Sequence, residues 1–220
     1  EDEFTGRPIL PEDNCELSNY PAFQRTKGDY GTDVAVFGFK EEEYPNWEIL
    51  MATAIIKNFV LAILYNKLEV VIKSDDFVIE INKKKLEHLL FTEYKDIQEL
   101  KYTRQIYKTV TEPDKTISTK IAEDNDLTLY VKYSETYYQS LSRFRSTGML
   151  INTTTGDVLP HFSVVIVVND VGENELSTTL REAEPPQHTE WKAKNITDNR
   201  PLHNRAAKYI REIGKAVQKT

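Results

Sequence analysis

The chain of 220 residues contains a single cysteine, Cys15, so no disulfide can form within it. Disulfide pairs mark oxidising compartments, and their absence favours a reducing one. No apolar run approaches the roughly 20 residues that span a bilayer, and no signal-peptide pattern opens the chain. We therefore expect a cytoplasmic protein without a membrane partner.

Positive charge is scarce over most of the chain. The net charge is −7, which does not favour attraction to nucleic acid or to an anionic membrane. The balance is uneven, because Lys192 to Thr220 holds 8 basic and 2 acidic residues. An acidic body thus carries a basic tail. The length suits one large domain or two small ones with a real core.

Hydrophobic patterning in the first half predicts both helix and strand. Residues 1–23 are polar and proline-marked, which indicates an arm or linker. The segment 33–39 alternates as a strand does. Pro45 then opens a helix, to about Asn66, that is apolar nearly all round and therefore buried on several sides. Two strands that flank the turn 74–76 predict a hairpin.

The second half continues with both element types, and the whole predicts an α+β fold. A mostly antiparallel sheet should carry helices on one face, as a two-layer sandwich. Helices are expected at 83–91, 93–110 and 173–184, and strands at 115–122, 126–133, 148–154 and 161–169. A last helix begins near Pro201. Its apolar stripe is Leu202, Ala206, Ile210, Ile213 and Val217, and its basic side is Arg205, Lys208, Arg211, Lys215 and Lys219.

The stretch QRTKGDYGTDVAVFGF, Gln24 to Phe39, joins a basic, glycine-punctuated turn to the first strand. Backbone amides at such a turn can cradle phosphate, and a lysine would add charge. The turn leads into a strand rather than a helix, and it lacks P-loop and Gly-x-Gly-x-x-Gly spacing. A plain tight turn is therefore the alternative to phosphate binding. The phosphate-side candidates are Lys27, Gly28, Gly31 and Thr32.

This turn and strand resemble the last Gly-Thr turn and closing strand of the nucleotide-binding domain in the GHKL ATPases. That superfamily includes gyrase, the ninety-kilodalton heat-shock chaperone, histidine kinases and MutL. Gly31 and Thr32 are the matching pair. Later motifs, over about residues 24–220, follow the order of a bacterial subgroup. They are Trp47, Leu68-Glu69-Val70, Arg145-Ser146-Thr147-Gly148-Met149, and Glu184-Pro185-Pro186-Gln187-His188 with Trp191.

The resemblance implies a region downstream of an ATP site, because the motifs of the site itself are missing. No Asp-x-Gly-x-Gly loop occurs, and Lys57 stands where the magnesium-binding helix should carry an acidic residue. We therefore read Asn58 as a satisfied polar residue in a packed helix. The implied organisation is an arm (1–23), the closing strand of a nucleotide-binding fold (24–40) and a transducer-like domain (41–220).

The function implied by this resemblance is non-catalytic coupling of the nucleotide state of an ATPase module to a partner or neighbouring domain. ATP and Mg²⁺ would enter through an upstream domain, with no cofactor held by this chain and no catalysis by it alone. A bacterial setting in DNA repair or defence is implied in the same way. The alternative is a stand-alone module that binds protein or nucleic acid through the basic last helix and the arginine segment.

The arginine segment SLSRFRSTGM, Ser140 to Met149, is the second candidate for anion binding. It sets two guanidiniums, Arg143 and Arg145, among four hydroxyl groups. Because guanidinium offers a planar fork of donors, we predict that one of them contacts a phosphate, of an upstream nucleotide or of a partner. Gly148 would let the backbone approach that ligand. A solvated strand entry is the alternative.

No catalytic or metal site is predicted from the remaining residues. The four histidines show no metal-ligand spacing with Cys15. No Ser-His-Asp or Cys-His arrangement can be argued, and paired carboxylates fall in turns. His188 and Trp191 follow a Glu-Pro-Pro turn, and we expect them to anchor that turn on the core.

Overall fold

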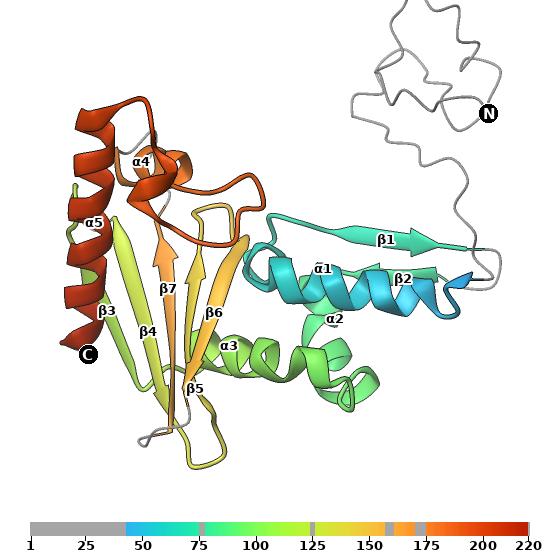
Figure 1. The fold of residues 1–220 in the computed structure, drawn as a ribbon. Helices are drawn as coiled ribbons and strands as arrows, with labels where there is room; N and C mark the ends of the chain where they lie inside the picture. The colour runs from blue at the N-terminus through green and yellow to red at the C-terminus, as the bar shows by residue number, and fades with distance from the viewer. Residues whose placement is uncertain (1–42, 75–77, 124–125, 157–160, 170–174, 220) are drawn as a thin grey trace, which may run out of the picture. The chain divides into compact units, whose positions relative to one another are not determined.

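The computed structural model describes residues 43–74, 78–123, 126–156, 161–169 and 175–219. From Asn46 onward the chain forms one compact unit with an α+β fold (Figure 1). The predicted arm and the turn-and-strand segment Gln24 to Phe39 lie outside the described residues. The phosphate-side candidates Lys27, Gly28, Gly31 and Thr32 therefore stay predictions.

The described residues contain five α-helices and two sheets. The helices are α1 (Trp47–Leu64), α2 (Lys83–His88), α3 (Lys101–Thr111), α4 (Glu175–Glu182) and α5 (Arg200–Gln218). The strands are β1 (Val70–Lys73), β2 (Val78–Ile81), β3 (Lys115–Thr119), β4 (Leu127–Tyr133), β5 (Gln139–Phe144), β6 (Leu150–Gly156) and β7 (Phe162–Val168). The predicted hairpin is confirmed, because β1 and β2 pair antiparallel.

The larger sheet has the strand order β3-β4-β7-β5-β6. Its pairs are antiparallel except β5 with β7, which run parallel. The sequence pattern predicted no strand at β5. The reason is that two of the three buried positions of β5 are the serines Ser140 and Ser142, and only the last, Phe144, is apolar. A strand of hydroxyl residues lacks the β-branched and aromatic composition by which strands are recognised.

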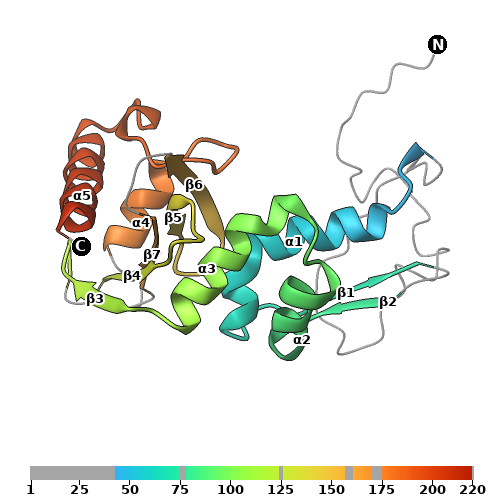
Figure 2. The same cartoon turned by 90° about the horizontal axis from the view of Figure 1, so that it is seen from below.

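Helices cover both faces of this sheet, whereas the sequence predicted helices on one face. Figure 2 shows α4 and α5 on one side of the strands and α1 and α3 on the other. β7 gives the physical reason. Val164, Ile166 and Val168 pack in the core beneath α4 and α5, while Val165 and Val167 pack in the core with α1 and α3. A strand that is apolar on both faces needs cover on both. The α+β class is confirmed, with three layers in place of two.

α1 is the central helix of the first core. Ala52, Ile56, Val60 and Leu61 are fully buried, as expected for a helix apolar nearly all round. Within the described residues it is the one helix long and apolar enough, by length and composition, to cross a membrane. The expectation that no apolar run is long enough to span a bilayer was therefore wrong for α1. From Ala52 onward α1 packs in the core with the hairpin and α2, whereas Ile49, Leu50 and Met51 near its start are exposed.

α3 begins later than the helix predicted over 93–110. A short 3₁₀ turn, Gln98–Leu100, precedes it, and α3 itself starts at Lys101. The Arg104 side chain donates to the Tyr94 carbonyl oxygen at 3.1 Å and to the Ile97 carbonyl oxygen at 3.2 Å. These bonds satisfy backbone oxygens in the irregular segment, so the chain need not be helical there.

The last helix is confirmed. The Asn199 side chain caps α5 by accepting from the Leu202 amide at 3.0 Å, with Pro201 in the first turn. On the apolar stripe Ile213 is buried, whereas Ile210 and Val217 are half-buried. The five basic residues predicted for the opposite side are all exposed.

Tyr209 ties α5 to α4. Its hydroxyl donates to Glu175 Oε2 at 2.9 Å, and Arg205 pairs with Glu175 Oε1 at 2.6 Å. Burial, followed by the hydrogen bond to Glu175, raises the pKa of Tyr209 to about 12. The neutral phenol is therefore part of the folded state.

This pKa predicts a loss of stability in alkali. Because the folded pKa lies above the unfolded value of about 10, the contribution of Tyr209 is full below pH 10 and disappears as the pH rises from about 10 to about 12. We expect Tyr209→Phe to be less stable at pH 8 and to show a shallower fall in unfolding free energy over that range. Urea titrations at several pH values measure it, with exposed Tyr133→Phe as the control. Equal slopes for Tyr209→Phe and wild type would contradict this role.

Candidate functional site

The arginine segment forms the end of β5 and a tight turn into β6. The Gly148 amide donates to the Arg145 carbonyl oxygen at 2.9 Å, and the Arg145 amide donates to the Met149 carbonyl oxygen at 3.0 Å. Gly148 has φ 86°, in the left-handed region that side chains disfavour. The turn of residues 145–149 thus requires a glycine at this position.

The same glycine lies directly against α1. The Ala62 amide donates to the Gly148 carbonyl oxygen at 3.3 Å, and a Cβ on Gly148 would stand 2.7 Å from Ala62 Cα. Lys67 Nζ adds a bond to the Ser146 carbonyl oxygen at 3.0 Å. The sequence correctly indicated a close backbone approach at Gly148, but the structure places α1 there, where a ligand was expected.

On its other side the turn is held by a buried carboxylate. The Glu184 side chain is 1% exposed and forms an ion pair with Arg145. Arg145 Nε donates to Glu184 Oε1 at 2.9 Å, and Trp191 Nε1 donates to the same oxygen at 3.1 Å. Burial, and then the charge of Arg181, lower the pKa of Arg145. The Glu184 carboxylate is therefore almost shielded from solvent, and the ion pair and hydrogen bonds compensate its charge.

The segment around Glu184 folds back on itself. The Lys192 amide donates to the Ala183 carbonyl oxygen at 2.9 Å, so the Glu-Pro-Pro stretch closes as a loop. The expectation that Trp191 anchors this loop on the core is confirmed, since it packs buried among residues of the sheet, α4 and α5. For His188 the same expectation was wrong, because its side chain is exposed and lies outside the core; its Nδ1 lies 2.9 Å from Glu184 Oε2.

Arg143 differs from Arg145 in its partners. Its Nη1 donates to Asn152 Oδ1 at 3.0 Å and lies 3.4 Å from Thr154 Oγ1, and both partners are neutral. No carboxylate of the described residues pairs with it. The regular antiparallel register of β5 with β6 places Asn152 opposite Arg143, and the register shifts only after this pair. Burial lowers the pKa of Arg143. Of the two predicted arginines, Arg143 is the one whose charge is uncompensated.

Cavities adjoin both arginines. One of about 160 Å³ lies beside Arg145, with Ser146, Thr147 and Arg181 in its wall. Another of about 560 Å³ lies beside Arg143, between β5, β6 and the C-terminal half of α5. Trp191 lines both. The structure therefore gathers the two predicted arginines around one buried indole.

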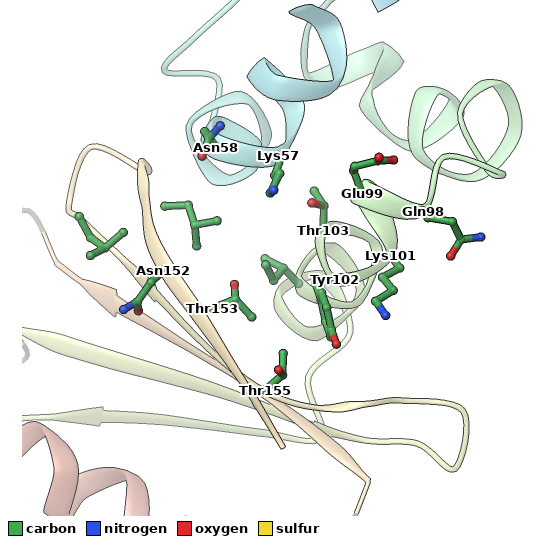
Figure 3. A pocket seen from close by; sticks show the side chains of 13 residues that line it. Lys57, Asn58, Gln98, Glu99, Lys101, Tyr102, Thr103, Asn152, Thr153 and Thr155 are labelled. Carbon is green, nitrogen blue, oxygen red and sulfur yellow. The ribbon is translucent and has the colours of Figure 1, made fainter. Parts of the chain in front are cut away.

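A third cavity, of about 510 Å³, lies on the opposite side of the sheet, between α1, α3 and β6 (Figure 3). Lys57 reaches toward it from α1, and Thr153 and Thr155 line it from β6. Asn58 Nδ2 donates to the Ala54 carbonyl oxygen at 2.8 Å, which confirms Asn58 as a satisfied polar residue. Among the described residues no group of three or more His, Cys, Asp or Glu side chains could hold a metal ion.

Sequence reasoning did not single out the partners that distinguish the two arginines. Glu184 was noted only as part of a motif, and Asn152 and Thr154 only as strand residues. The available signal was the joint occurrence of the Arg-x-x-Gly-Met and Glu-Pro-Pro motifs. Arg145 and Glu184 are 39 residues apart in the chain, and a single sequence does not reveal such a contact.

Comparison with known proteins does not identify a relative. No family model, no curated protein and no solved structure matches this chain. The likeness to the GHKL ATPases therefore rests on the order of motifs along the sequence. Two of those motifs, the turn of residues 145–149 and the loop from Glu184 to Trp191, meet through Arg145 and Glu184.

Two glycine-to-alanine substitutions should change the free energy of unfolding in opposite directions. Gly148→Ala introduces a side chain at positive φ against the α1 backbone, so we expect a loss of at least about 2 kcal/mol of unfolding free energy. Gly214→Ala adds a methyl within α5 where nothing lies within 4 Å, so we expect a gain of about 0.5–1 kcal/mol. Chemical denaturation of both variants measures this. A Gly148→Ala variant as stable as wild type would show that the turn is not held against α1.

A double-mutant cycle tests the buried ion pair. Arg145→Met leaves the Glu184 carboxylate without its cation, and we expect a loss of about 3 kcal/mol, the low end for a broken buried pair, because Trp191 still donates. The double variant Arg145→Met/Glu184→Leu should lose less than the two single losses combined, by about 1–3 kcal/mol. Arg181→Met, an exposed neighbour, is the control. Additive losses would mean that Arg145 and Glu184 do not act as a pair.

Proposed function

We propose that this chain is the non-catalytic, transducer-like coupling region of a GHKL-type ATP-binding protein. In this role it relays the nucleotide state of an upstream domain to a partner or neighbouring domain. The observation that carries the proposal is the position of the turn of residues 145–149. Gly148 packs against the backbone of α1, and Arg145 forms an ion pair with Glu184. The turn therefore joins α1 to the loop that contains Trp191.

The turn of residues 145–149 makes a backbone contact with α1 on one side and an ion pair with Glu184 on the other, and both contacts resist displacement. On the α1 side, backbone packs on backbone at Ala62 with no room for a side chain. On the other side, the Glu184 carboxylate needs its donors, because an unpaired buried charge is strongly unfavourable. Close-packed elements shift between discrete arrangements instead of deforming gradually. A displacement of α1 would move Arg145, and with it Glu184 and Trp191.

The position of α1 in the sequence suggests that a signal from an upstream domain would reach α1 first. α1 begins at Trp47, directly after residues 1–46, which contain the predicted phosphate-side turn with Gly31 and Thr32. ATP and Mg²⁺ would be held by the upstream domain, together with that turn. In this scheme α1 would receive the signal, and the turn of residues 145–149 would pass it to the loop from Glu184 to Trp191.

The basic side of α5 is less suited to the alternative, nucleic-acid binding. Glu175 pairs with Arg205, and Glu212 approaches both Arg211 and Lys215. Carboxylates within the helix and its neighbour thus offset part of the charge that phosphate contacts would need. Binding of this chain to duplex DNA that weakens steeply with salt would favour the alternative.

We expect this chain alone to release no phosphate from ATP above a buffer control, because the adenine loop and catalytic glutamate of a GHKL site are missing from its sequence. A steady-state phosphate-release assay on purified protein measures this. Clear turnover by the isolated chain would contradict a purely coupling role.

The coupling itself is tested in the protein encoded by the full reading frame. With Trp47, and any tryptophan encoded outside these 220 residues, replaced by Phe, the Trp191 indole reports on the loop at Glu184. A non-hydrolysable ATP analogue should change its fluorescence. Arg145→Lys keeps the charge but removes the two-point contact with Glu184. This variant should bind the analogue within about twofold of wild type and lose most of the fluorescence change.

The matched control for this experiment is Arg211→Lys, on the exposed side of α5, which should change neither binding nor signal. The proposal is wrong if the reading frame encodes no Asn-bearing helix and no Asp-x-Gly-x-Gly motif upstream. It is also wrong if the Arg145→Lys protein gives the full Trp191 response.

A further inference from the structure

We infer that the cavity between β5, β6 and α5 binds a small amphipathic anion, whose charged head lies on Arg143 and whose apolar body lies along α5. The inference goes beyond the coupling function, because it needs neither an upstream domain nor a nucleotide. It rests on three features of the cavity: an uncompensated guanidinium, an apolar wall, and a helical glycine that keeps the space open.

The first feature is the charge on Arg143. Nη1 is used by Asn152 and Thr154, both neutral, so no negative charge of the described residues offsets the guanidinium. Glu190, the one acidic residue in the cavity lining, is paired with Lys192. Burial lowers the pKa of Arg143, yet an arginine stays charged throughout the physiological range. A partly buried cation with neutral partners is completed by an anion from outside the chain.

The second feature is the nature of the walls. Leu141 and Ile166 line the cavity from the sheet, and Ile210, Ile213 and Val217 line it from α5. The indole of Trp191 closes another side. The cavity, of about 560 Å³, has apolar side chains on its sheet and α5 walls, and Arg143 is the one charged group in its lining that has no oppositely charged partner among the described residues, since Lys192 and Glu190 pair with each other. A few polar groups among apolar walls are the usual composition of small-molecule sites. The cavity suits an alkyl or aromatic body better than a second charged group.

The third feature is Gly214, which lines the same cavity from α5. Glycine in the interior of a helix costs about 1 kcal/mol relative to alanine, and here no neighbour requires it, since a Cβ would meet nothing within 4 Å. The glycine therefore does not serve close packing inside the chain. It leaves the α5 backbone open to the cavity, where a ligand body would lie.

The chemistry of Arg143 selects the head group. Nε and Nη2 make no hydrogen bond with the described residues, so two donors remain for a ligand. Two oxygens of a carboxylate or a phosphate monoester match this fork. The ligand class is thus a carboxylate or a phosphate monoester on an apolar body of about ten carbon atoms, by comparison with pockets of similar volume.

Four probes separate the contributions of charge and apolar body. Decanoate and decyl phosphate carry both a negative charge and an apolar body. Decanol has the apolar body without the charge, and acetate has the charge without the apolar body. Decanoate is used below its micelle concentration. Isothermal titration of the 220-residue chain should show one site for decanoate or decyl phosphate, with decanol and acetate each at least tenfold weaker. The stronger of the two anionic probes identifies the head group.

Three variants then locate the site. Arg143→Met should weaken decanoate at least tenfold and leave decanol within about twofold. Gly214→Leu fills the cavity without touching Arg143 and should weaken decanoate at least tenfold. The control Arg211→Met, an exposed arginine on α5, should bind like wild type.

The inference is overturned if the stronger anionic probe binds no better than decanol, if neither anionic probe binds at 1:1 stoichiometry, or if Gly214→Leu binds that anionic probe as wild type does. A melting curve accompanies each variant. If Arg143→Met does not fold, the comparison of the stronger anionic probe with decanol on wild type and on Gly214→Leu still decides the outcome.

Discussion

The backbone of the turn between β5 and β6 runs in contact with the backbone of α1, and only a residue without a side chain can occupy that position. Gly148 meets this constraint twice, by its positive φ and by the space that Ala62 leaves. The contact sets where β5 ends and β6 begins. Since β5 is the strand that pairs with both β6 and β7, the constraint also fixes how the first core meets the sheet.

The buried Glu184 extends this constraint to the other face of the sheet. Its carboxylate is 1% exposed, and it needs Arg145 from the turn and Trp191 from its own loop. Trp191 packs with residues of α4 and α5. A single turn thus connects two hydrophobic cores that the sheet otherwise separates. This connection is the physical basis for the proposed relay.

Arg143 and Arg145, two residues apart in the arginine segment, show how similar sequence positions acquire different chemistry. Arg145 lies beyond the strand and meets a carboxylate, so its charge contributes to the fold. Arg143 lies within β5 and meets an amide and a hydroxyl, so its charge remains available. The difference arises from the register of β6, which places Asn152 and Thr154 beside Arg143. The same residue type therefore belongs to the proposed relay at one position and to the proposed ligand site at the other.

Periodic patterns predicted the parts of this fold whose packing follows local chemistry. α1, α5 and the β1–β2 hairpin were predictable because their apolar residues recur at helical or alternating spacing. β5 was not, because two of its three buried residues are serines, and tertiary packing rather than an apolar alternation buries them. The cover on both faces of the sheet could have been anticipated from the uninterrupted apolar run of β7.

The candidate site was predictable only in part. Arg143 and Arg145 were found from composition, because two guanidiniums among hydroxyl groups are unusual in this acidic chain. Their separate roles depend on Glu184 and Asn152, which reach them through strand register and a 39-residue separation. No local pattern encodes such contacts. The glycine at position 148 was recognised as a point of close approach, while its partner, Ala62, became visible only in the fold.

The central claim is that α1 and the Glu184 loop are mechanically joined through the turn of residues 145–149. Native-state hydrogen exchange by NMR tests it at two protons, the Ala62 amide on α1 and the indole N–H of Trp191. Arg145→Lys disturbs only the Glu184 side directly. The account predicts that exchange of both protons accelerates in this variant. Faster exchange at Trp191 with unchanged exchange at Ala62 would contradict it.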